Sequence, residues 1–235
     1  MAAGHGAARR ARPCPYVRYA PRPVTARGLA PAVAAGTPIT GHASRLAAVT
    51  EVHGQVREEE RDAQQEARRR VALSQIRQYG DPVLRMPARP VAGFDDDLAR
   101  LAERMKRLMA EARGVGLAAN QVGILQRLAV IQPSNEEEPQ ALVNPAIVET
   151  SGTKETDDEG CLSLQGVLVP VERDCRVTVE AKDEHGGDVR LELEGLAARV
   201  VQHELDHLDG VLIIERTDPE SRREALATLR HRPSL

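Results

Sequence analysis

The feature that most constrains this chain is the run His203-Glu204-Leu205-Asp206-His207. Four residues make about one helical turn, so a helix through the run places both imidazoles on one face, where one metal ion bridges them. Glu204 then lies beside the ion, where it can act as a base. The alternative is a pair of surface histidines without a metal. Because two imidazoles alone hold a catalytic metal poorly, the fold must bring a third ligand to this helix, roughly Leu196 to Leu208.

The identity of the third ligand separates classes of metal enzyme. The sequence follows the metzincin pattern H-E-x-x-H-x-x-G-x-x-H as far as Gly210, but Ile213 stands where the third histidine belongs. A thermolysin-like site would instead use a downstream glutamate, for which Glu215, Glu220 and Glu224 are available. The first of these is close to the motif, and the other two lie in a short polar tail.

A cysteine upstream of the helix offers another ligand. Cys161 stands in the segment Glu159-Gly160-Cys161-Leu162-Ser163, after a polar loop and at the start of an extended apolar run. A thiolate with two imidazoles makes a tetrahedral site with one open position, suited to Zn²⁺, Fe²⁺, Ni²⁺ or Co²⁺. The alternative for an isolated cysteine is a small buried hydrophobe. We expect Cys175 to be such a buried residue, because it lies on the same face of its strand as the apolar residues. Cys14 lies in the N-terminal tail.

Hydrophobic periodicity predicts both helices and strands. Apolar residues recur at three- and four-residue spacing through residues 95–114, which begin with aspartates and end with Gly114. Residues 175–183 and 188–195 alternate apolar and polar side chains on either side of a Gly-rich turn, which indicates a half-buried hairpin. Further short strands are expected at residues 125–132 and 141–149.

Composition divides the chain into two regions. The first fifty residues carry seven arginines and no acid, whereas nearly all the acids lie beyond Glu51. We expect residues 1–70 to form an Arg/Ala/Pro-rich extension, disordered to about residue 40 and weakly helical from about Ser44 to Arg70. Its alternative interpretations are an organelle transit peptide and a start codon placed too far upstream. Residues 71–235 are the expected catalytic domain.

Charge and cysteine content limit the environment and the partners. With 41% apolar residues the chain can bury a core, and a formal charge of −3 gives no general attraction to DNA or to anionic membranes. No apolar stretch of about eighteen residues is present, and three cysteines, an odd number, do not indicate a disulfide framework. We therefore expect a reducing, cytoplasmic setting, with organelle import as the minor alternative. Arginine outnumbers lysine 29 to 3, a bias that GC-rich codons produce, so we expect a bacterial source.

Three separated segments carry a family resemblance. The segments are Gly114-Val115-Gly116-Leu117-Ala118-Ala119-Asn120-Gln121, then residues 159–163, then residues 203–207. In this order and spacing they resemble the three motifs of peptide deformylases, and the likeness extends from about Ile76 to Arg216. Two positions depart from the family pattern: Gln165 stands in place of proline, and Leu168 in place of an aromatic residue. The resemblance therefore leaves open which substrate side chains the protein prefers.

The resemblance implies an α+β fold with antiparallel β-sheets around the central H-E-x-x-H helix, an N-terminal helix and a short C-terminal helix. It implies that Cys161, His203 and His207 bind one divalent ion, with Fe²⁺ as the native metal and Zn²⁺, Ni²⁺ or Co²⁺ as alternatives. Glu204 would take a proton from water and later protonate the leaving amine.

Further roles follow from the same resemblance. The side-chain amide of Gln121 and the backbone N–H of Leu162 would stabilise the developing oxyanion. The pocket for the methionine side chain would be formed by Val115, Leu196 and Val200. The backbone that pairs with the substrate peptide would be that of Gly114, Gly116 and Gly160.

The implied reaction is removal of the formyl group from the N-terminal formylmethionine of nascent polypeptides, with release of formate. The alternatives are a zincin-type metallopeptidase and a noncatalytic module that binds ribosomes or nascent chains through the C-terminal segment, residues 219–232. Arginines in that segment would contact rRNA phosphates, and such contact is also compatible with a catalytic protein. A monomer is favoured, with no membrane and no DNA partner.

Overall fold

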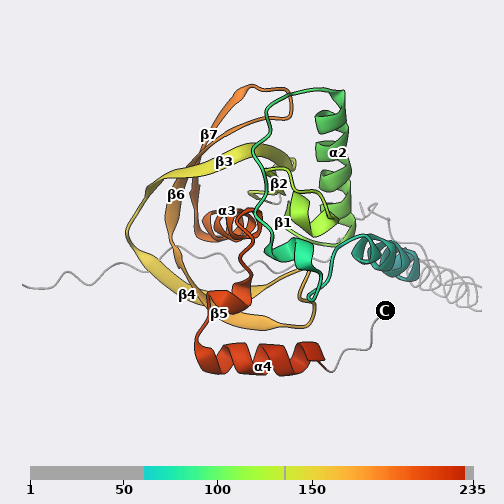
Figure 1. Ribbon diagram of the computed structural model, residues 1–235, viewed down its shortest axis with the longest axis vertical. Coiled ribbons are helices and arrows are strands. Elements are labelled where there is room, and N and C mark those ends of the chain that lie inside the picture. The colour runs from blue at the N-terminus through green and yellow to red at the C-terminus, as the bar shows by residue number, and fades with distance from the viewer. Residues whose placement is uncertain (1–60, 135, 231–235) are drawn as a thin grey trace, which may run out of the picture. The chain divides into compact units, whose positions relative to one another are not determined.

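The computed structural model describes residues 61–134 and 136–230 (Figure 1). The expected disorder before residue 40 and most of the N-terminal extension lie outside these residues. Residues 61–74 are helical, and the side chains of residues 61–70 are mostly exposed, whereas Ala72 is fully buried. The described residues from Arg69 onward belong to one compact unit, which contains all the elements below. Among the described helices, none is both long and apolar enough to cross a membrane.

Helix α2 spans Asp96–Glu111, close to the predicted range. The Asp95 side chain accepts a hydrogen bond from Leu98 N (3.0 Å) and caps the helix. The aspartates of the first turn stabilise the partial positive charge at the N-terminus of the helix. The predicted apolar stripe is the buried face. The residue with positive φ at the end of the helix is Arg113 (58°), so Gly114 does not supply the left-handed conformation there.

The larger sheet has five antiparallel strands in the order β1-β2-β3-β6-β7. It contains both predicted short strands and the predicted hairpin. Val177 and Val179 are buried as expected, but so is Thr178 between them, which is flanked by its cross-strand neighbours Glu149 and Glu192. Cys175 is only partly buried and precedes the strand. The strands are β1 Gly116–Ala118, β2 Leu128–Ile131, β3 Gln140–Thr150, β6 Arg176–Lys182 and β7 Asp188–Glu194.

A second sheet pairs β4, Lys154–Gly160, with β5, Leu168–Asp174. The prediction of a polar loop before Cys161 was therefore wrong. The acidic β4 sequence forms a strand because its backbone pairs along its whole length with β5, and its buried acid, Glu159, is compensated by arginines. Cys161 follows directly where β4 ends.

Helix α3, Gly195–Leu208, lies between the two sheets, in contact with β1, β2, β6 and β7 on one side and with β5 on the other (Figure 1). The prediction of an α+β fold around a central helix is confirmed. The short C-terminal helix α4, Pro219–Arg230, packs on β5 through Ala225 and its apolar neighbours. Within the part of the chain that the structure describes, there are also three short 3-10 helices: η1 Pro82–Arg85, η2 Ala119–Val122 and η3 Ile213–Glu215.

Candidate active site

Three potential metal ligands meet between α3 and the end of β4. Their ligand atoms, on Cys161, His203 and His207, all lie within 4.8 Å of one another. Cys161 Sγ is 3.2 Å from His207 Nε2, and the two imidazole centroids are 4.9 Å apart. Within the described part of the chain, this is the only group of three or more His, Cys, Asp or Glu side chains close enough to share an ion. The three predicted ligands are thus brought together.

The chemistry of this donor set fits a divalent transition metal. Burial raises the pKa of the Cys161 thiol, but the adjacent His207 and His203 outweigh burial and hold this pKa well below its usual value. The thiolate is the form of cysteine that binds metals. One thiolate and two imidazoles suit Zn²⁺, Fe²⁺, Co²⁺ or Ni²⁺.

Glu204 adds a buried carboxylate beside these donors. It is 3% exposed, and its Oε2 has no hydrogen-bond partner among the described residues. Burial raises the pKa of Glu204 to about 7, although His203 and His207 act to lower it. A carboxylate with a pKa near neutrality can both take up and return a proton at working pH.

Gly116 allows β1 to pass close to this carboxylate. A Cβ at position 116 would lie 2.8 Å from Glu204 Cδ and 2.9 Å from Val200 Cγ1, both too close for real contacts. Gly114, in the same segment, has a similar role toward the motif that contains Cys161, because a Cβ there would lie 2.8 Å from Leu162 Cδ1. Both glycines therefore serve close approach between segments that are distant in sequence.

The Gln121 amide lies beside the thiolate. Its Oε1 accepts a hydrogen bond from Ala118 N (2.8 Å), which fixes the orientation of the amide. Its Nε2 donates to Ser163 Oγ (3.1 Å) and lies 3.7 Å from Cys161 Sγ. The geometry thus places an N–H donor next to the candidate ligands, on the 3-10 helix η2.

Gln165, which stands where relatives have proline, is held by a hydrogen bond to Gln78. Gln165 Nε2 donates to Gln78 Oε1 (3.2 Å), and Gln78 Nε2 donates in turn to Leu162 O (3.2 Å). Tyr79 N also donates to Ser163 O (2.8 Å). The segment before η1 therefore supports the loop that follows Cys161.

The predicted pocket residues belong to one apolar cluster. Val200 is buried, and Val115 and Leu196 are partly buried against the same cluster. The second departure, Leu168, lies at the start of β5 with 71% of its surface exposed. It pairs across the small sheet with Gly160, one residue before Cys161.

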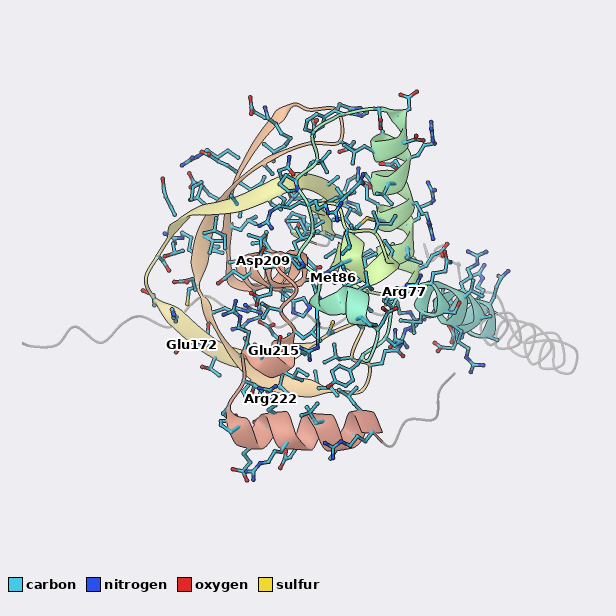
Figure 2. The ribbon with its side chains drawn as sticks, in the orientation of Figure 1. Arg77, Met86, Glu172, Asp209, Glu215 and Arg222 are labelled. Atoms are coloured by element: carbon cyan, nitrogen blue, oxygen red, sulfur yellow. The ribbon has the colours of Figure 1, made fainter. Side chains whose placement is uncertain are left out.

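The glutamates downstream of the motif do not reach the metal group. Glu215 lies in η3, below α3 in the view of Figure 2, where its carboxylate accepts hydrogen bonds from Leu212 N (3.0 Å) and from Arg85. Glu220 and Glu224 are exposed on α4. The thermolysin-like ligand set is therefore absent from the described group, and Cys161 occupies its place.

A buried charge network, not predicted from the sequence, lies behind the ligands. Glu159 Oε2 lies 3.0 Å from His203 Nδ1, and the same carboxylate accepts hydrogen bonds from Arg173 and Arg199. Burial raises the pKa of Glu159, but the bonds from His203 and Arg173 outweigh it and lower the pKa to about 2. Asp206 accepts a further bond from Arg173 (2.6 Å). The signal in the sequence was the presence of charged residues on a helix expected to be central.

Fold and site together define a class: hydrolases in which a central H-E-x-x-H helix offers two histidines and a glutamate, and a cysteine completes the metal-binding group. The family model for polypeptide deformylase matches residues 73–223. The chain belongs to the peptide deformylase family. Deformylases hydrolyse the formyl group of nascent formylated peptides, and this chain is such a hydrolase.

Curated relatives and solved structures agree with this assignment. A peptide deformylase of Thermotoga sp. (strain RQ2) is 50% identical over 150 residues, which are 64% of this chain and 90% of the relative. One from Acidothermus cellulolyticus is 45% identical over 160 residues, 68% of this chain and 87% of the relative.

Among solved structures, a Synechococcus elongatus peptide deformylase in complex with actinonin has a TM-score of 0.63 and 45% identity, covering 66% of this chain and 86% of that one. The Thermotoga maritima enzyme has a TM-score of 0.59 and 50% identity, covering 61% of this chain and 97% of that one.

Proposed function

We propose that this chain removes the formyl group from N-formylmethionyl peptides at a single metal site formed by Cys161, His203 and His207. The observation that carries the proposal is the meeting of these three donors beside the buried carboxylate of Glu204. A bound divalent ion supplies Lewis acidity, which lowers the pKa of a water molecule and polarises a carbonyl group. The protein side chains supply the remaining chemistry.

Glu204 is proposed as the proton carrier. Its unpartnered Oε2 takes the proton as water adds to the formyl carbon, and returns it to the departing amine when the C–N bond breaks. The products are formate and a peptide with a free amino terminus. A pKa near neutrality suits both halves of this cycle.

Gln121 and Leu162 are proposed as donors to the oxyanion. The amide of Gln121 is held by Ala118 N and Ser163 Oγ, so its N–H groups are oriented before substrate binds. The Leu162 carbonyl is held by Gln78, which fixes the peptide unit that follows the proposed N–H donor. Preorganised donors of this kind stabilise the charge without a cost of reorganisation during the reaction.

The substrate is proposed to bind along the glycine-rich strands. Val115, Leu196 and Val200, which share one apolar cluster, accept the methionine side chain. The backbone at Gly114 to Gly116 and at Gly160 pairs with the peptide as an added strand. Within the described residues, β1 is at an edge of its sheet and so has backbone groups available for such pairing.

Fe²⁺ is proposed as the native ion, since the donor set accepts it and the resemblance favours it. We also propose a monomer that works in the bacterial cytoplasm, where formylated chains are made. Arginines on α4, such as Arg222 and Arg223, are exposed and would contact rRNA phosphates near the exit of nascent chains. Metal analysis of protein purified without oxygen tests the first of these proposals.

Release of formate tests the proposed reaction. Full-length protein loaded with Ni²⁺ or Fe²⁺ under anaerobic conditions is expected to release one formate for each formyl-Met-Ala-Ser peptide consumed. The same peptide without the formyl group should remain intact. Cleavage of an internal peptide bond, with no formate released, would contradict the proposal and favour a metallopeptidase.

The catalytic domain is proposed to comprise residues 71–235. The side chains of residues 61–70 are mostly exposed, and the family match begins at residue 73. Deletion of residues 1–70 is therefore expected to change the melting temperature by less than about 4 °C, which is about 1 kcal/mol for a domain of this size. Formate release per enzyme should stay within about twofold of the full chain. A larger loss of either would place the extension within the folded domain.

A further inference from the structure

Arg199 connects the helix of the proposed metal site to both strands of the small sheet. It lies on α3 one turn before His203 and is 8% exposed. Its Nη1 donates to Val171 O on β5 (2.8 Å), and its Nη2 donates to Glu155 O on β4 (2.9 Å). A single side chain therefore holds two backbone strands against the helix.

The same guanidinium also reaches the carboxylate behind a ligand. Arg199 Nη1 donates to Glu159 Oε1 (2.8 Å), and Glu159 Oε2 lies 3.0 Å from His203 Nδ1. Glu159 is 5% exposed and stands two residues before Cys161, at the end of β4. Arg199 thus contacts the strand that leads to the cysteine and the group that orients the histidine.

The other buried arginine is arranged differently. Arg173, on β5, donates twice to Glu159 on β4 (2.9 and 3.0 Å) and once to Asp206 on α3 (2.6 Å), so it links the small sheet to the helix through side chains. Asp206 also pairs with Arg216, whose side chain is 49% exposed. Among the described hydrogen bonds, neither of these two guanidinium groups donates to a backbone carbonyl of β4 or β5. Gln202 on α3 bonds the backbone of β5 at Asp174 (3.1 and 2.9 Å), whereas the Arg199 guanidinium bonds the backbone of both β4 and β5.

We propose that Arg199 is a positioning residue for the metal site. By fixing the sheet that ends at Cys161 to the helix that carries His203 and His207, it sets the distance between the thiolate and the two imidazoles. The inference rests on the metal site proposed above. Groups that orient metal ligands typically contribute about 10–100-fold in metal affinity or activity. Arg199 acts on both parts of the ligand set.

Charge and position predict opposite effects when Arg199 is replaced. Arg199→Met removes a positive charge near a cation, so charge alone predicts tighter metal binding. Loss of the connection predicts weaker binding, by about tenfold, because the thiolate and the imidazoles are no longer held together. Arg199→Lys keeps the charge but cannot reach both carbonyl groups with the spacing of a guanidinium, so intermediate weakening is expected.

The test is Co²⁺ binding to the full-length chain, measured by chelator competition and by the thiolate-to-cobalt absorption band. Arg199→Met should weaken Co²⁺ binding about tenfold and shift or reduce that band. Arg216→Met, a matched control, removes a charge from the same network without touching the small sheet, and should bind Co²⁺ as tightly as the unaltered chain or tighter. Leu98→Ala, in a buried position on α2, controls for loss of stability alone.

The outcomes separate this inference from the proposed function. If the unaltered chain gave no thiolate-to-cobalt band, the proposed metal site itself would be wrong. If it bound Co²⁺ but Arg199→Met bound equally or more tightly with the same spectrum, only the positioning role would be overturned. The same conclusion would follow if Leu98→Ala weakened binding as much as Arg199→Met at a similar melting temperature.

Discussion

Glu204→Gln is expected to reduce formate release by about 10²–10⁴-fold while the protein still binds its metal. The substitution keeps the size of the side chain but removes the group that accepts and returns the proton. Burial raises the pKa of Glu204 to about 7, so the native residue is suited to proton transfer near neutral pH, whereas an amide is not. The measurement is the rate of formate release per bound metal ion, with metal content determined on the same sample.

A matched control distinguishes this role from that of a ligand. Glu215→Gln changes a nearby acid that pairs with Arg85 and accepts a bond from Leu212 N, so it should retain metal and most activity. A thermolysin-like site would show the reverse pattern, with metal lost from the Glu215 variant. Activity in Glu204→Gln within about tenfold of the unaltered enzyme would contradict the proposed proton transfer.

The sequence predicted the parts of the fold that depend on local periodicity. Helix α2 and the β6–β7 hairpin follow directly from apolar residues at helical and strand spacing. The H-E-x-x-H spacing predicted α3 because the chemistry of a shared ion requires one helical turn between the histidines. These features are encoded within short segments, so one sequence is sufficient to find them.

Features that depend on distant partners were not predictable in this way. The segment before Cys161 has the composition of a loop, since acidic residues are rare in strands. It forms β4 because β5 pairs with it and because Arg173 and Arg199, from other elements, neutralise Glu159. No local pattern records such compensation.

The reasons for the glycines were likewise hidden. Gly114 was consistent with a helix end, yet the left-handed residue is Arg113, and a Cβ at position 114 would meet the Leu162 side chain at 2.8 Å. A Cβ at position 116 would displace the side chains of Glu204 and Val200, which lie far along the chain on α3. The family resemblance indicated both positions without explaining them, and the structure supplies the steric cause.

The second large effect is expected at Cys161. Cys161→Ala removes the thiolate that lies 3.2 Å from His207 Nε2 and leaves two imidazoles, which are insufficient to hold a catalytic ion firmly. Because loss of a residue that only supports a ligand already costs about 10–100-fold, loss of the ligand itself should weaken metal binding by more than about 100-fold. Formate release should fall to that of the metal-free protein.

Two further cysteine substitutions make the assignment specific. Cys175→Ser should leave metal binding unchanged, because Cys175 precedes β6 and does not belong to the group of candidate ligands. Cys161→Asp, which offers an oxygen ligand of similar reach, should retain some metal but little activity, because a carboxylate does not reproduce a thiolate's bonding to a transition metal. Metal content and formate release are measured for all three variants under anaerobic conditions, since a thiolate at an open site is sensitive to oxidants. Stoichiometric metal in Cys161→Ala, with formate still released, would show that the third ligand lies elsewhere and that the proposed site is wrong.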